Sequence, residues 1–152
     1  CGSSRKKHKL VEIMAIQTIQ EKQEEIVSEF EMFDDWMAKY EYLIDLGKDL
    51  PLIKEELKTD ERLIEGCQSR VWLNANCENG KMQFSADSEA IITKGIIGLL
   101  IRVLNDENPE TILKTDLKFI SDIGLQEHLS PTRANGLNGM IKKMKIEALK
   151  YI

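Results

Sequence analysis

Cys67 is the residue of this chain best suited to chemistry. It follows Gly66 and comes just before a stretch with strand periodicity, so it is expected in a turn. A thiolate is a nucleophile and a soft carrier of sulfur, and an adjacent glycine lets the backbone turn freely and lets another protein approach closely. The sequence therefore predicts a reactive thiol at Cys67. A small buried side chain is the alternative interpretation, because most cysteines are of that kind.

The other cysteines and histidines are weaker candidates. Cys77 alternates with Leu73 and Ala75 on one strand face, which favours core packing. His8 lies in the N-terminal tail, and His128 is interpreted as structural. A cysteine hydrolase needs a histidine beside its nucleophile, and no spacing here predicts such a pair.

Arg133 is expected in the first turn of the last helix. The helix dipole disfavours a cation there by a few tenths of a kcal/mol, roughly, so an arginine at this place suggests a binding role. An ordinary surface ion pair is the alternative.

Composition limits the class of protein. The chain has 152 residues, 42% of them hydrophobic and 31% charged, which suits one domain with a real core. No apolar run approaches the roughly 20 residues of a membrane span, so we expect no membrane span. Residues 1–13 carry +3 of the net charge of -5, which leaves -8 for the remainder. An acidic body argues against nucleic-acid binding.

The cysteine count and the N-terminus bear on location and domain limits. Three scattered cysteines form neither a disulfide framework nor a C-x-x-C metal site, which favours a reducing, cytoplasmic setting. We interpret residues 1–13 as an N-terminal extension or a processing remnant, and residues 14–152 as a single domain.

Periodicity predicts an α+β fold, with a small antiparallel sheet packed against several helices. An amphipathic helix is expected around residues 19–33 and a second after Asp34 and Asp35, ending at Gly47 and Pro51. Its predicted apolar face comprises Trp36, Met37, Tyr40, Leu43 and Ile44.

Four later helices are expected. A buried central helix should run from Glu89 to about Leu104 with Asp87 or Ser88 as its cap. Short helices should follow Asn108 and span residues 116–123, and Ser130-Pro131 should open the last helix.

The strands are predicted from alternation and one turn. Residues 71–78 alternate in polarity, Asn79-Gly80 is a strong hairpin signal, and residues 81–86 should return antiparallel. A lone hairpin is marginal in water, so it must pack on helices, with a third strand drawn from the segment before Glu55 as one option.

Several separate stretches of the chain resemble the SufE family of sulfur acceptor proteins. The resemblance covers most of the chain, from about Glu25 to Leu149. The stretches are Phe33-Asp34-Asp35-Trp36 with Lys39-Tyr40 and residues 43–47; Leu63-Ile64-Glu65-Gly66-Cys67-Gln68-Ser69-Arg70-Val71-Trp72; Ala86-Asp87-Ser88 with Ile92 and Lys94-Gly95; and His128-Leu129-Ser130-Pro131-Thr132-Arg133 with Gly136-Leu137 and Met140-Ile141.

The resemblance implies a fold like that of the iron–sulfur scaffold proteins and a role in iron–sulfur cluster assembly. It implies that Cys67 accepts persulfide sulfur from a cysteine desulfurase of the SufS or CsdA type, stimulates that enzyme and passes the sulfur to a Suf-type cluster scaffold. Arg133 matches the family's arginine implicated in the acceptor function. The chain would then be a persulfide carrier and accessory protein, with no cofactor of its own, since pyridoxal phosphate belongs to the desulfurase. We expect a monomer or a weak homodimer.

Two other functions stay open. A cluster scaffold would use several thiolates, but the chain has Asp87 and Ser88 where related scaffolds carry a second ligand cysteine. A thiol hydrolase or peroxidase would use Cys67 as its nucleophile. We expect the persulfide on Cys67 to be shielded from reductants when no partner is bound. An exposed Trp72 or Met82 side chain would contribute to that shielding.

Overall fold

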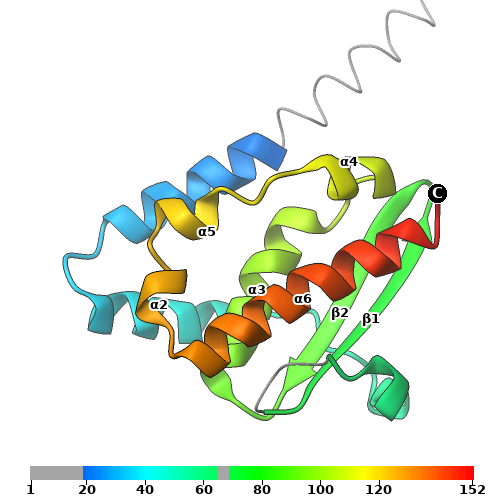
Figure 1. Ribbon diagram of the computed structural model, residues 1–152, viewed down its shortest axis with the longest axis horizontal. Helices are drawn as coiled ribbons and strands as arrows, with labels where there is room; N and C mark the ends of the chain where they lie inside the picture. The colour runs from blue at the N-terminus through cyan, green and yellow to red at the C-terminus, as the bar shows by residue number, and fades with distance from the viewer. Residues whose placement is uncertain (1–18, 65–68) are drawn as a thin grey trace, which may run out of the picture.

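A two-stranded antiparallel sheet lies against a set of helices in the computed structural model, which describes residues 19–64 and 69–152 (Figure 1). The predicted α+β class is confirmed. A first helix is described over residues 19–31. The elements that follow are α2 (Trp36–Lys48), the 3-10 turns η1 (Glu55–Leu57) and η2 (Asp60–Arg62), β1 (Val71–Glu78), β2 (Lys81–Ser88), α3 (Ile91–Leu104), α4 (Pro109–Lys114), α5 (Phe119–Asp122), η3 (Gln126–His128) and α6 (Pro131–Leu149).

The hairpin forms as predicted, because its turn has the residues that the geometry requires. Asn79 and Gly80 have φ of 53° and 78°, the left-handed conformation of a type I′ turn. Val71 and Leu73 are buried on the inner face of β1. The second strand extends to Ser88, two residues beyond the predicted end.

The expected third strand is reduced to a single bridge. Leu52 pairs in parallel with Ala86, where the Ala86 amide donates to the Pro51 carbonyl at 2.9 Å and the Ile53 amide donates to the Ala86 carbonyl at 3.1 Å. Two residues later the chain turns into η1.

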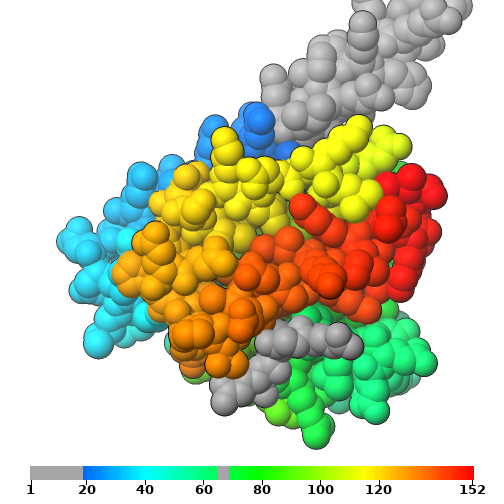
Figure 2. Space-filling view, viewed as in Figure 1, coloured from blue at the N-terminus to red at the C-terminus, as the bar shows by residue number. Residues whose placement is uncertain are grey.

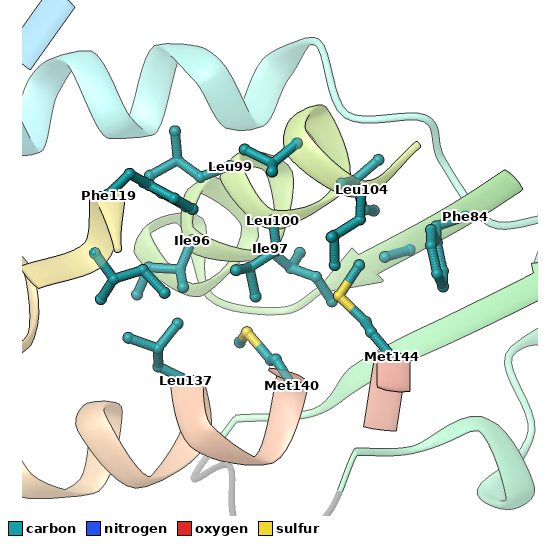
Figure 3. Close-up of a cluster of buried hydrophobic side chains, with 14 of the residues drawn as sticks. Phe84, Ile96, Ile97, Leu99, Leu100, Leu104, Phe119, Leu137, Met140 and Met144 are labelled. Atoms are coloured by element: carbon teal, nitrogen blue, oxygen red, sulfur yellow. The ribbon is translucent and has the colours of Figure 1, made fainter. Parts of the chain in front are cut away.

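The central helix α3 is buried as predicted, with nine buried residues out of 14. Figure 3 shows Leu137 and Met140 of α6 pointing toward Ile96 and Ile97 of α3. Figure 2 shows α6 running across one face of the molecule, with the α4–α5 segment along one side of it. The core therefore lies between α3, α6 and the inner face of the sheet.

Three predicted helix starts are confirmed by their caps. The side chains of Asp35, Asn108 and Ser130 accept hydrogen bonds from backbone amides in the first turns of α2, α4 and α6. The predicted cap of α3 is wrong: Asp87 and Ser88 still belong to β2, and α3 begins at Ile91 after Ala90.

Other boundaries also differ. Gly47 does not end α2 but lies buried within it, and the helix ends at Lys48. Met37 is 75% exposed, so it does not belong to the apolar face of α2. The predicted helix over residues 116–123 is limited to α5. Within the described ranges, no helix is both long and apolar enough to cross a membrane.

Candidate functional site

Cys67 lies outside the described residues, but the chain on both sides of its segment is described. The Ile64 amide donates to the Val71 carbonyl at 2.9 Å, and Leu63 pairs with Trp72 in an antiparallel bridge. The predicted helical turn before this point is present as η2. We call residues 65–70 the cysteine segment. The chain therefore enters and leaves this segment as two adjacent antiparallel stretches.

Arg70, at the end of the cysteine segment, is hydrogen-bonded to the chain where β2 leads into α3. The carbonyl of Arg70 accepts hydrogen bonds from the Ser88 hydroxyl at 2.9 Å and from the Glu89 amide at 3.2 Å. The guanidinium of Arg70 lies 3.9 Å from the Glu89 carboxylate. Ser88 was predicted as a helix cap, and its contact with Arg70 could not be read from sequence, because the two residues are 18 positions apart.

A small cavity of about 70 Å³ brings the end of the cysteine segment together with Arg133. Ser69 lies two residues after Cys67 and borders the cavity, and the starts of α3 and α6 form its other walls. The lining residues are Ser69, Ala90, Thr93, Ile96, Thr132, Arg133, Gly136 and Met140. Sequence reasoning selected Cys67 and Arg133 separately. The fold brings Arg133 beside the residue that follows the thiol by two positions.

The electrostatics of this cavity favour an anion. Neither α3 nor α6 has an acidic residue in its first turn, so the positive ends of two helix dipoles meet at the cavity. The carboxylate of Glu89, just before α3, lies beside the Arg70 guanidinium. Arg133 is exposed, and its guanidinium has no ion pair with any carboxylate of residues 19–64 or 69–152. A cation and helix N-termini stabilise a thiolate relative to a thiol, which is the ionisation that sulfur chemistry requires.

Asp87 lies opposite Trp72 in the sheet register and is held by two lysines. Its carboxylate accepts from Lys58 at 2.7 Å and lies 3.3 Å from the Lys94 ammonium. Burial acts to raise the pKa of Asp87, but the hydrogen bonds from Lys58, the Ser88 amide and Lys94 outweigh it and hold the pKa below its usual value. Both carboxylate oxygens are therefore already engaged by cations.

The remaining sequence candidates lie away from the cavity lining. Cys77 is half-buried, faces Met82 across the sheet and packs against the core, as predicted. Met82 is fully buried, so it is not the exposed side chain that was expected to shield the persulfide. Trp72 is half-buried, with the Lys58 ammonium over its ring. His128 stacks on Trp36, in agreement with a structural role, and His8 lies outside the described residues.

A larger hollow of about 920 Å³ lies between the first helix and the α4–α5 segment. Its described lining holds neither a cysteine nor a histidine. In the part of the chain that the structure describes, no three His, Cys, Asp or Glu side chains converge as metal ligands.

Comparisons with known proteins agree with the sequence resemblance. The SufE family, described as an Fe-S metabolism associated domain, matches residues 24–148. A SufE-like protein of Rhizobium meliloti is 36% identical over 130 residues, covering 82% of this chain and 93% of that protein. A SufE-like protein of Synechocystis is 36% identical over 139 residues, covering 91% and 87%.

Two further similarities concern a plant protein and a solved structure. The chain is 37% identical over 139 residues to SufE-like protein 1, chloroplastic/mitochondrial, of Arabidopsis thaliana, covering 91% of this chain and 38% of that protein. It is similar in fold to the solution structure of a hypothetical protein from Thermus thermophilus, with a TM-score of 0.71, 22% sequence identity, and coverage of 85% of this chain and 94% of the other.

Proposed function

Because the chain belongs to the SufE family, we propose that it is a sulfur acceptor that carries persulfide on Cys67. The family ties the chain to iron–sulfur metabolism. The donor in this proposal is a pyridoxal-phosphate cysteine desulfurase of the SufS or CsdA type, which the acceptor stimulates, and the recipient is a Suf-type cluster scaffold. The pyridoxal phosphate stays with the desulfurase, so the chain is a carrier and not a stand-alone enzyme.

The transfer step is a thiol exchange. The Cys67 thiolate attacks the terminal sulfur of the donor persulfide, a new sulfur–sulfur bond forms on Cys67, and the donor cysteine leaves as a thiolate. One sulfur–sulfur bond forms as another breaks, so the transferred sulfur keeps its oxidation state and no external oxidant or reductant is needed. The proton of the transferred sulfur then passes to solvent, which leaves the persulfide anion.

The observation that supports this proposal most directly is the cavity beside Ser69 and Arg133. Two helix N-termini and a guanidinium surround it, and each favours the thiolate that attacks and the persulfide anion that results. Asp87 supports an acceptor over a scaffold, because its carboxylate is paired with Lys58 and Lys94 where a scaffold would present a cluster ligand. We further propose that residues 14–152 act as one cytoplasmic domain, as a monomer or a weak homodimer.

The test is mass spectrometry after anaerobic incubation with desulfurase, pyridoxal phosphate and cysteine. The chain should gain the mass of one sulfur atom on the peptide that contains Cys67. Cys67→Ser should gain none and should not stimulate the desulfurase, whereas the matched control Cys77→Ser should behave like wild type. Loss of activity in Cys77→Ser alone would identify the other thiol as the carrier.

The same preparation separates the alternatives. A cluster scaffold would turn brown on anaerobic reconstitution with iron and sulfide, whereas the proposed acceptor stays colourless. A thiol hydrolase or peroxidase would turn over a model ester or peroxide without any desulfurase.

A further inference from the structure

Trp36 and His128 form a stacked pair that joins α2 to the turn before α6. Their ring centroids are 3.9 Å apart and their planes differ by 15°. Trp36 is the first residue of α2, and His128 ends η3, two residues before the cap residue Ser130. His128 is exposed and Trp36 only half-buried, so the stack lies at the surface and fixes geometry more than it buries area.

Two hydrogen bonds reinforce this attachment. Nδ1 of His128 lies 2.9 Å from the carbonyl oxygen of Gly124, and the hydroxyl of Tyr40 donates to the carbonyl of His128. Gly124 has φ of +71°, and a Cβ added there would lie 3.7 Å from Cζ2 of Trp36. The chain therefore turns tightly around the stacked rings. We call Trp36, Tyr40 and His128 the α2–η3 clasp.

The core reaches the first turn of α6 only through Ala134. Pro131, Thr132 and Arg133 are exposed and Ala134 is half-buried. The first fully buried residues of α6 are Gly136 and Leu137, one turn further on. Before the turn, Leu129 is 8% exposed, and it directly follows His128. The position of Arg133 is thus set from its N-terminal side, by the Ser130 cap and the clasp.

We propose that the α2–η3 clasp positions Arg133 at the cavity next to the cysteine segment, so that Trp36 and His128 are positioning residues for sulfur transfer. The proposal rests on the function proposed above. Neither Trp36 nor His128 lines the cavity, so in this proposal they act through Arg133. Loss of the stack should leave α6 anchored in the core by Leu137 and Met140 while its first turn becomes less well defined.

The test is a double-mutant cycle between His128 and Arg133, read as the rate of sulfur transfer to the chain from a desulfurase. His128→Ala and Arg133→Ala should each slow transfer. The expected loss for His128→Ala is roughly threefold to tenfold, which corresponds to the interaction free energy of one aromatic pair. The double variant should be no slower than Arg133→Ala alone, because the clasp has nothing left to position. His128→Phe keeps a ring on Trp36 and should recover most of the rate.

Several outcomes would overturn the proposal. Wild-type rate in His128→Ala, no effect of Arg133→Ala, or multiplied losses in the double variant would each show that the clasp does not act through Arg133. Failure of the wild-type chain to take up sulfur would instead reject the proposed function, and mass spectrometry registers that before any variant is compared.

A second measurement does not depend on sulfur transfer. Amide hydrogen exchange at residues 131–134 should be faster in His128→Ala than in wild type, with the amides of residues 140–148 unchanged. If His128→Ala does not fold, Trp36→Phe, which weakens the stack without removing it, should show the same pattern at smaller amplitude. Unchanged exchange in the first turn would contradict the proposal.

Discussion

Gly47 and Gly95 are in backbone contact where α2 crosses α3. A Cβ added at Gly47 would lie 3.0 Å from the Gly95 nitrogen, and one added at Gly95 would lie 2.3 Å from the Leu43 carbonyl oxygen. Both glycines are therefore required by helix packing. The buried α3 carries the cavity residue Thr93 on its first turns, so this contact also fixes one wall of the site.

Gly95→Ala should destabilise the protein, because the new methyl group meets a backbone carbonyl that cannot rotate away. Overpacking of this kind costs about 1–3 kcal/mol, which urea unfolding would measure. Gly98→Ala is the matched control on the same helix, since its nearest neighbour would be 3.6 Å away. There alanine should be neutral or should stabilise by about 0.5–1 kcal/mol through its better helix propensity. Equal effects at the two positions would contradict the close-packing explanation.

These glycines also show what the sequence could and could not predict. A glycine near a helix end followed by Pro51 has the pattern of a terminator, yet Gly47 stands inside α2 because Gly95, far along the chain, requires close approach. The caps at Asp35, Asn108 and Ser130 and the Asn79-Gly80 turn were predictable, because each depends on hydrogen bonds or dihedrals within a few residues.

The candidate site divides in the same way. Cys67 and Arg133 could be selected from local features, namely a glycine beside a thiol and a cation against the helix dipole. Their relation through Ser69 and the cavity could not, because it depends on how α6 packs against the start of α3. The clasp between Trp36 and His128 was missed for the same reason, although an aromatic residue at a helix start was visible.

Ser88→Ala should slow sulfur acceptance with little loss of stability. Its hydroxyl donates to the Arg70 carbonyl at 2.9 Å, which anchors the chain three residues after Cys67. The same hydroxyl accepts from the Ala90 amide at 3.2 Å. Each such hydrogen bond contributes about 0.5–1.5 kcal/mol, so the transfer rate should fall severalfold while the free energy of unfolding falls by no more than the sum of the two. Ser85→Ala, on the same strand but without this contact, is the control. A wild-type transfer rate in Ser88→Ala would show that the anchor is dispensable.

Protonation of the Asp87 carboxylate should lower the stability of the folded protein in acid. Its pKa is lower in the folded protein than in the unfolded chain, so the folded state releases this proton more readily and gains stability above the unfolded pKa, near about 4. That contribution is lost as the pH falls through the lowered value. Asp87→Asn should therefore flatten the fall of thermal midpoint below about pH 4. Asp45→Asn, which removes an exposed carboxylate from α2, should leave the wild-type slope, and a wild-type slope in Asp87→Asn would reject the assignment.

Lys22 and Glu107 form an ion pair that joins the first helix to the segment after α3. The Lys22 ammonium lies 3.1 Å from the Glu107 carboxylate and donates to the Asn105 carbonyl at 3.0 Å. Glu107 is only 3% exposed, and burial raises its pKa while Lys22 partly opposes the rise. The lysine therefore offsets part of the cost of burying this carboxylate in its charged form.

Lys22→Met should cost about 3 kcal/mol in urea unfolding at pH 7, because it removes the ion-pair partner of this buried carboxylate. The pKa of Glu107 should then rise further, so the folded state takes up a proton on acidification before the unfolded chain does. The penalty should consequently shrink as the pH is lowered toward about 5. Adding Glu107→Gln to Lys22→Met should abolish that pH dependence. The same cost at both pH values in Lys22→Met would mean that Glu107 does not depend on Lys22 for its charge.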